Sequence, residues 1–332
     1  MKQESTTTMF CLRKSRLTIA LVALNSLVIP TVVCGGEQEL IAPGSKLEKV
    51  TGGLQFSEGP AWHPLGFLLF EDIPRNRIMK LEAGDKVGVF REPSGRANGL
   101  AFDREGRLVA AEGNSMDGGR RISRTEKDGR VVTLADRFDG KLLNSPNDLA
   151  IDAQGRIYFT DPRYGSQEGV EQDKEAVYRI DPDGKLTRII DSVSRPNGVA
   201  ISIDQKTLYV ADNREGGAKR VLLAFDLSSD GNASKSRSLY DFGSGRGIDG
   251  MTLDSAGRIW ATAGSGEKAG VHVFQMNADR TATKLLTVVK TPEDPTNCTF
   301  GGPDRDLLYI TTATSLYRIR TTVRGMLSPP GK

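Results

Sequence analysis

Six residues with side-chain oxygens recur along this chain at nearly constant spacing. Successive members are 40, 49, 50, 52 and 48 residues apart, and the series consists of Glu58, Asn98, Asn147, Asn197, Asp249 and Asn297. Two carboxylates and four amide oxygens would supply the negative charge and the several oxygen ligands that a hard divalent cation needs. Zinc is a weaker match, because the only two histidines, His63 and His272, lie outside the series.

Turn formation is a competing explanation for the amide members of this series. Asn98-Gly99 and Asn197-Gly198 are pairs that tight turns favour, and asparagine tolerates left-handed backbone. Taken one at a time, Asn98, Asn197 and Asn297 are better explained by turn chemistry than by function. Six oxygen-bearing residues at one position of a repeat are harder to explain in that way, so both interpretations stay open.

Each of these residues opens a unit of about 40–50 residues with four strand-like segments. The third unit is typical, with β-branched and aromatic runs at 149–151, 156–160, 176–180 and 185–190, separated by Asp- and Gly-containing turns. Four short strands in each of six units predict an all-β fold, a six-bladed β-propeller with four antiparallel strands per blade. A β-sandwich would not produce six units in this phase. We expect residues 40–55 to add a strand to the last blade and close the ring.

The opening residue of each unit precedes the innermost strand, so the six side chains are expected to surround one end of the central channel. Because neighbouring strands are antiparallel, the second strand of a blade ends at the same face, which places Asp72, Glu112, Asp161 and Asp212 there in structural roles. Long loops follow at 113–120, 162–175 and 213–219. Such loops commonly carry specificity, and Arg163 and Tyr164 are candidates for substrate contact.

The first 36 residues have the pattern of an export signal. Basic residues precede an apolar run, Leu17–Val33, and small residues follow it. We therefore predict a signal peptide at 1–36, a single propeller domain at 37–325 and a C-terminal tail at 326–332, with export to the periplasm or the extracellular space. A retained membrane anchor and a lipid anchor at Cys34 are the alternatives.

Removing residues 1–36 also removes the net positive charge. The whole chain has a formal charge of +3, and that segment alone carries four basic residues and one acidic residue. A neutral mature chain predicts no nucleic-acid partner and no membrane partner beyond the export signal. Only Cys298 of the three cysteines lies beyond the signal, so no disulfide is expected within the mature chain.

From about Thr51 to Arg320 the sequence resembles the gluconolactonase family, also called the SMP-30 or regucalcin-like family. The resemblance depends on the order and spacing of several short motifs, which are Ser57-Glu58-Gly59-Pro60, Asn144-Ser145-Pro146-Asn147-Asp148, Tyr158-Phe159-Thr160-Asp161-Pro162, Arg195-Pro196-Asn197-Gly198, Ile248-Asp249-Gly250-Met251 and Cys298-Thr299-Phe300-Gly301-Gly302. Each motif alone is weak, and together they are specific.

The resemblance implies a divalent cation held by one Glu, two Asn and one Asp. By motif position these are Glu58, Asn147, Asn197 and Asp249, with Asp249 also the catalytic acid/base. Calcium is the expected ion, with zinc, manganese and magnesium as alternatives. Asn147 would also contact the substrate, Asn98 would face the substrate or support the ligands, and Asn297 would be structural.

Two departures from the family pattern leave the substrate open. Some relatives have an arginine that contacts substrate where this chain has Ser145, and a histidine often found after the second blade's second strand is absent from Glu112-Gly113-Asn114. The implied activity is hydrolysis of a small-molecule sugar lactone, in which the cation polarises the ester carbonyl and Asp249 takes a proton from water. A nucleophilic serine is not expected, since no Gly-x-Ser-x-Gly elbow occurs. Another metal-dependent esterase or phosphotriesterase, and a non-catalytic calcium-stabilised binding propeller, are the alternatives.

Overall fold

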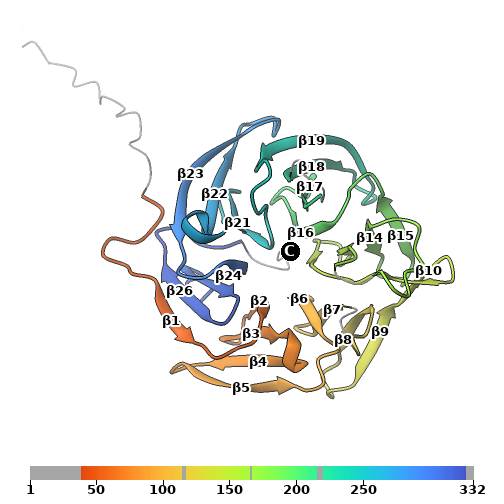
Figure 1. Cartoon of the computed structure of the whole chain (residues 1–332), viewed down its shortest axis with the longest axis horizontal. Coiled ribbons are helices and arrows are strands. Elements are labelled where there is room, and N and C mark those ends of the chain that lie inside the picture. Colours follow the sequence, from red (N-terminus) through yellow and green to blue (C-terminus); the bar gives the residue numbers. More distant parts are fainter. Residues whose placement is uncertain (1–38, 114–116, 165–166, 215–219, 327–332) are drawn as a thin grey trace, which may run out of the picture. The chain divides into compact units, whose positions relative to one another are not determined.

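The computed structural model describes residues 39–113, 117–164, 167–214 and 220–326. The predicted signal peptide lies outside these residues. Six four-stranded antiparallel sheets stand around a central channel, which confirms the predicted six-bladed β-propeller (Figure 1). No helix of the described residues is long and apolar enough to cross a membrane.

The blades follow one another in chain order, each beginning at the channel and ending at the rim. The first three blades contain β2 (Ser57–His63), β3 (Phe67–Asp72), β4 (Arg77–Glu82) and β5 (Lys86–Arg91), then β6 (Ala97–Phe102), β7 (Leu108–Glu112), β8 (Arg121–Thr125) and β9 (Val131–Ala135), then β12 (Leu149–Ile151), β13 (Ile157–Asp161), β14 (Ala176–Ile180) and β15 (Leu186–Ile190). The next two contain β16 (Pro196–Ile201), β17 (Thr207–Asp212), β18 (Val221–Leu227) and β19 (Ala233–Asp241), then β20 (Met251–Leu253), β21 (Ile259–Ala263), β22 (Gly270–Met276) and β23 (Thr283–Lys290).

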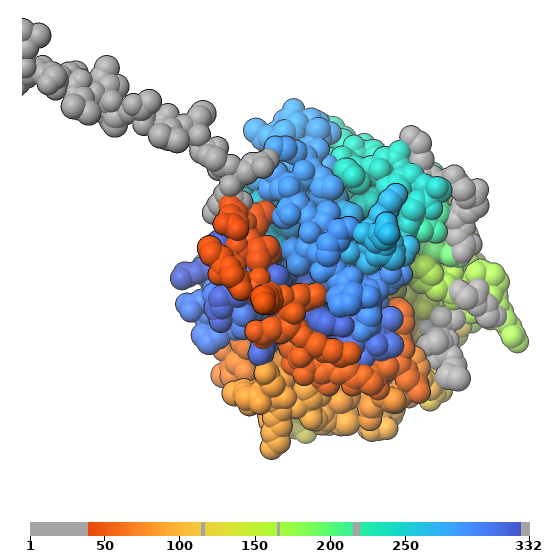
Figure 2. Space-filling model, turned by 60° about the vertical axis from the view of Figure 1, so that its left-hand side comes forward, coloured from red at the N-terminus to blue at the C-terminus, as the bar shows by residue number. Residues whose placement is uncertain are grey.

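The last blade is completed by the first strand of the described chain. It contains β24 (Pro295–Gly301), β25 (Leu307–Thr312) and β26 (Leu316–Arg320), and β1 (Glu48–Thr51) pairs antiparallel with β26. Figure 2 shows this early segment, in red, packed against the blue strands of the last blade. The predicted closure of the ring is therefore confirmed.

Short elements outside the blades are a β10–β11 hairpin (Arg137–Phe138 and Lys141–Leu142) and two 3-10 turns, η1 (Ile73–Arg75) and η2 (Gly266–Lys268). The chain stays attached to the propeller beyond β26, because the Met326 N–H donates to the Leu253 carbonyl at 3.0 Å.

A repeated Asp-x-x-Gly-Arg turn joins the first and second strands of several blades. In the third blade Asp152 Oδ1 accepts the N–H groups of Gln154 and Arg156, and Arg156 Nε donates to Asp152 Oδ2 at 2.5 Å. Asp254 and Arg258 repeat the ion pair at 2.6 Å in the fifth blade. Asp supplies the turn and Gly adopts the positive φ that it requires.

Apolar and aromatic side chains from facing sheets pack between neighbouring blades. Phe159 and Tyr178 of the third blade, for example, are fully buried and belong to one cluster with Val109 and Ile122 of the second blade. This packing holds the innermost strands in place around the channel, and those strands position the candidate site.

Candidate active site

A cavity of about 420 Å³ lies at the end of the channel where the innermost strands begin. Five members of the predicted ring line it, and the remaining lining residues come from the loops of the same face. The lining residues are Phe56, Glu58, Ile73, Asn98, Asn147, Tyr164, Arg195, Asn197, Asn213, Arg220, Arg246, Gly247 and Asp249.

Asp249 is fixed from both its backbone and its carboxylate. Its N–H donates to the Thr262 carbonyl at 2.9 Å, and its own carbonyl accepts the Gly198 N–H of the preceding blade at 2.7 Å. Arg246 Nη2 donates to Oδ2 at 2.6 Å, and Asn197 Nδ2 donates to Oδ1 at 2.9 Å. Burial raises the pKa of Asp249, while Arg246 and the Asn197 amide act in the opposite direction.

Glu58 lies almost fully buried at the same cavity, with 2 % of its surface exposed. Its Oε2 accepts the N–H of Gly59 at 2.9 Å. Burial, followed by the charge of Asp249, raises the pKa of Glu58 well above its usual range. Two carboxylates in a desolvated site repel each other, so this pair favours a compensating positive charge between them.

The two asparagines that the family pattern marks as ligands also lie here. Asn147 is held through its backbone, since its N–H donates to the Thr160 carbonyl and its carbonyl accepts the Gly99 N–H. Its side-chain Oδ1 is buried and has no hydrogen-bond partner among the described residues. Asn197 presents its Nδ2 to Asp249 and to the Tyr164 hydroxyl, which accepts at 2.8 Å.

These four side chains fit an oxygen-coordinated divalent cation. The buried Oδ1 of Asn147 is an orphaned acceptor, and such an atom normally finds a donor or an ion. Glu58 and Asp249 supply the charge. The side-chain amide of Asn197 would have to flip, so that its oxygen rather than its nitrogen faces the cation. Within the described ranges no three His, Cys, Asp or Glu side chains are placed to hold a metal, so a cation here would need the amide oxygens.

Asn297 is placed differently from the other ring members. It lines a second cavity further along the channel, and its Oδ1 accepts the Cys298 N–H at 2.8 Å. The spacing of the repeat predicted a place in the ring. The side chain instead lies against Gly250, where an added Cβ would be 2.0 Å from Asn297 Cγ.

Among the predicted substrate contacts, Asn98 and Tyr164 line the cavity, whereas Ser145 and Arg163 do not. The Ser145 N–H donates to Asp161 Oδ1 at 2.7 Å. Arg163 is buried, and its guanidinium donates to the carbonyls of Asn144 and Glu168. The structure therefore does not support a substrate contact by Arg163, because its charged group holds the loop backbone.

The acidic residues at the ends of the second strands bind backbone donors, as predicted from their repetition. Asp72 accepts the Gln55 N–H at 2.9 Å, Asp161 accepts the Asn144 N–H at 2.8 Å and Asp212 accepts the Ser194 N–H at 3.0 Å. Glu112 differs, since its partners are the side chains of Arg91, Arg121 and Ser123. Asp72, Asp161 and Asp212 therefore anchor loops of this face, whereas Glu112 ties its own strand to residues of β5 and β8.

Sequence reasoning missed the cationic lining of the cavity. Arg246 bonds Asp249, and the Arg195 guanidinium lies 5.0 Å from the centre of the Tyr164 ring. Arg220 also lines the cavity, and its Nη1 donates to the Gly245 carbonyl at 3.0 Å. Arg195 and Arg246 had a local signal, because they stand two residues before Asn197 and three residues before Asp249.

Residues 56–314 match the family model described as the SMP-30/Gluconolactonase/LRE-like region, and the chain belongs to this family. A gluconolactonase of Zymomonas mobilis is 32 % identical over 308 residues, which are 84 % of this chain and 82 % of the relative. Pentonolactonase XacC of Haloferax volcanii is 29 % identical over 263 residues, 78 % of this chain and 82 % of the relative.

Solved structures in the family have the same architecture. A gluconolactonase from Xanthomonas campestris superposes with a TM-score of 0.74 at 32 % sequence identity, covering 85 % of this chain and 91 % of the other.

Proposed function

We propose that this protein is a lactonase that hydrolyses a sugar lactone with the help of one divalent cation at Glu58, Asn147, Asn197 and Asp249. Membership of the gluconolactonase family and relatives named as gluconolactonase and pentonolactonase support lactone hydrolysis. One observation carries the assignment of the site. Asp249, clamped by Arg246 and Asn197, lines the same cavity as the buried Glu58 and the orphaned Oδ1 of Asn147.

The bound cation would polarise the lactone carbonyl and stabilise the negative charge that develops on its oxygen. Asp249 takes a proton from the attacking water as the new carbon–oxygen bond forms. It then returns the proton to the ring oxygen as the ester bond breaks, giving an open-chain hydroxy acid. Arg246 holds Oδ2 of this carboxylate but leaves the group able to accept the proton, because each carboxylate oxygen has two lone pairs.

Tyr164, Asn98 and the arginines of the lining would orient the substrate. A polyhydroxylated ring presents several hydroxyl groups, and the Tyr164 hydroxyl and the Asn98 amide can bond to them. Calcium is the ion that we favour, because the four ligands are all oxygen donors and no histidine lines the cavity. Zinc, manganese and magnesium are the alternatives.

The test is hydrolysis of glucono-1,5-lactone by the chain from Glu37 onward, stripped with chelator and then supplied separately with calcium, zinc, manganese or magnesium. Activity should return with a preferred ion. Asp249→Asn should lower kcat by about a hundredfold or more, the usual contribution of general acid–base catalysis, while the chelated variant still folds cooperatively.

Asp128→Asn is a matched control, since Asp128 is an exposed hairpin residue paired with Arg130. Full activity in Asp249→Asn would contradict the assignment of this residue. Bound cation without turnover of a panel of lactones would favour a binding propeller instead.

Export is proposed on the sequence pattern of residues 1–36 alone. N-terminal sequencing of protein recovered outside the cytoplasm should show these residues removed. An intact N-terminus on membrane-bound protein would favour an anchor.

A further inference from the structure

A second cavity, of about 610 Å³, lies in the same channel on the far side of the polar ring. Neighbouring residues divide the two spaces, because Glu58 and Asn147 line the candidate active site while Gly59 and Asp148 line this one. It extends along β2, β6, β12, β16, β20 and β24 to the turns at 64–66 and 302–305. We refer to it as the distal cavity.

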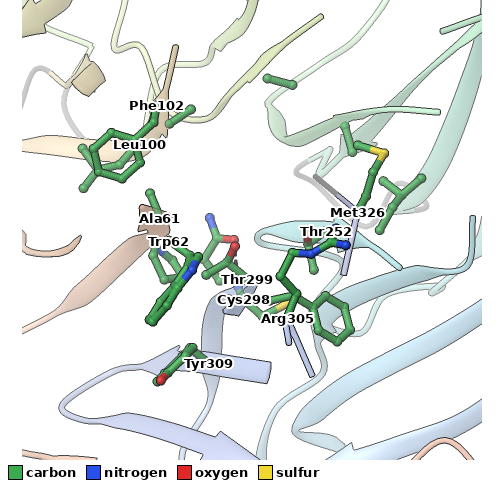
Figure 3. A pocket seen from close by; sticks show the side chains of 18 of the residues that line it. Ala61, Trp62, Leu100, Phe102, Thr252, Cys298, Thr299, Arg305, Tyr309 and Met326 are labelled. Carbon is green, nitrogen blue, oxygen red and sulfur yellow. Dashed lines mark hydrogen bonds between the residues drawn. The ribbon is translucent and has the colours of Figure 1, made fainter. Parts of the chain in front are cut away.

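Apolar and aromatic side chains form most of its wall (Figure 3). Trp62 stacks on Tyr309 with ring centres 5.8 Å apart and an interplanar angle of 11°. Phe102 contributes from β6, and Met326 contributes from the segment after β26. Cavities of several hundred Å³ with such walls and a few polar groups are typical small-molecule sites in proteins.

The polar groups at the inner end of the distal cavity are already bonded within the protein. Asp148 accepts the N–H groups of Leu149 at 2.9 Å and Val199 at 3.3 Å. The Cys298 thiol donates to the Trp260 carbonyl at 3.3 Å. This end can therefore accommodate an apolar group, and the carboxylate of Asp148 disfavours an anion there.

Arg305 is the only cationic residue among the described residues that line the cavity, and it belongs to the turn between β24 and β25. Its Nη1 donates to the Gly325 carbonyl at 2.8 Å. The adjacent acids are paired elsewhere, Asp306 with Arg320 and Asp304 with Arg324. Among the described residues no carboxylate forms a salt bridge with Arg305, so the outer end of the cavity presents a positive charge.

The geometry points to an apolar monocarboxylic acid as the ligand of the distal cavity. Its hydrocarbon part would lie among Trp62, Phe102 and Met326, and its carboxylate would bond the Arg305 guanidinium at the mouth. The opposite orientation would bring two carboxylates together at Asp148. Leu65, which lines the cavity with 83 % of its surface exposed, adds an apolar contact at the rim. This site is separate from the lactonase chemistry and does not depend on it.

Calorimetric titration with octanoate and with octan-1-ol tests both parts of this assignment. The wild-type protein should bind both compounds, octanoate more tightly. Arg305→Gln should weaken octanoate binding by about tenfold or more, as the loss of a charge-assisted hydrogen bond implies, and leave octan-1-ol binding unchanged. Arg324→Gln, which removes an exposed arginine outside the lining, is the matched control and should bind octanoate like the wild type.

No binding of octanoate by the wild-type protein would overturn the proposal, and so would equal octanoate affinity in Arg305→Gln. If the wild type fails to bind octanoate but a Leu327→Asp variant binds it, the proposal is overturned as well. Residues 327–332, rather than a carboxylic acid, would then be the occupant of the distal cavity. Lactone hydrolysis should be unchanged in Arg305→Gln, so loss of one function can be told from loss of the other.

Discussion

Arg246 Nη2 donates a hydrogen bond of 2.6 Å to Asp249 Oδ2, three residues further along the chain. The same guanidinium donates through Nη1 to the carbonyls of Pro295, at 2.7 Å, and Gly264, at 3.2 Å. Pro295 begins β24 of the next blade. Arg246 therefore ties the proposed catalytic carboxylate to the neighbouring blade, and the position of Asp249 depends on how two blades meet.

Replacing Arg246 should alter both the rate and its pH dependence. Arg246→Gln removes a charge-assisted hydrogen bond of about 1.5–3 kcal/mol, which corresponds to a fall in kcat/KM of about 10- to 100-fold. The guanidinium lowers the pKa of Asp249, so its loss raises that pKa further. At saturating cation, the profile of kcat/KM against pH should have its acidic limb at higher pH in Arg246→Gln than in the wild type.

A purely structural Arg246 would lower stability without moving that limb. Arg130→Gln, on an exposed hairpin, is the control and should retain the wild-type profile.

Glu58 should make the chelated protein less stable as the pH rises. Burial and Asp249 raise the pKa of Glu58 in the folded state, so between the unfolded and folded pKa values the folded protein binds more protons than the unfolded chain. Stability then falls with rising pH across that window. Melting temperatures of chelated protein between pH 5 and pH 8 should decrease, and should decrease less in Glu58→Gln.

Added calcium should reverse this loss in the wild type, because binding to the folded state alone stabilises it. Glu58→Gln should gain much less from calcium. The exposed Glu105→Gln should behave like the wild type in both measurements. A calcium response in Glu58→Gln equal to that of the wild type would contradict the proposed ligand set.

The architecture was predictable because each blade repeats the same local chemistry. The recurrence of Asn147 and Asn197 at the start of innermost strands, together with turns such as Asp152 to Arg156, gave the number of blades and their phase. Placement of five ring members around one cavity then follows from the radial arrangement of the sheets. Because the backbone geometry is the same in each unit, a sequence pattern that marks a strand or turn in one unit marks it in the others.

Side-chain direction was harder to predict, because it depends on contacts between blades. Asn297 has the spacing of a ring member, yet Thr296 takes the ring position, because its carbonyl accepts the Gly250 N–H just as the Asn147 carbonyl accepts the Gly99 N–H. The Asn297 amide lies against Gly250 of the preceding blade. Arg163 turns back to Asn144. The contact of Arg246 with Pro295 joins residues 49 positions apart, and no local sequence pattern predicts it.

Tyr164 and Arg163 are adjacent in sequence and should differ in the kind of defect that their replacement causes. Tyr164→Phe removes the hydroxyl that accepts the 2.8 Å hydrogen bond of Asn197. The expected result is a fall in kcat/KM of about 2- to 10-fold and a loss of unfolding free energy of no more than about 1.5 kcal/mol, since one such bond contributes about 0.5–1.5 kcal/mol.

Arg163→Gln should instead reduce the free energy of unfolding by about 1.5–3 kcal/mol, because its buried guanidinium bonds Asn144 and Glu168. Its kcat/KM below the melting transition should stay within about threefold of the wild type, a change of about 0.6 kcal/mol. A larger loss of kcat/KM with unchanged stability would restore Arg163 as a substrate contact.

Gly59 and Gly53 offer a matched pair that separates backbone strain from steric overlap at the site. Both have positive φ, 54° and 74°, but a Cβ on Gly59 would lie 1.9 Å from the Asn98 carbonyl oxygen, while nothing lies within 4 Å of one on Gly53. Gly53→Ala should therefore cost only the left-handed backbone energy, about 1–2 kcal/mol.

Gly59→Ala must in addition displace Asn98 in the neighbouring blade and disturb the N–H that donates to Glu58 Oε2. We expect a larger loss of stability in urea denaturation and a weaker affinity for the cation, with Gly53→Ala retaining full affinity. Equal destabilisation in the two variants would mean that the β2–β6 contact yields to a methyl group. The close approach of these two strands would then not be what positions Glu58.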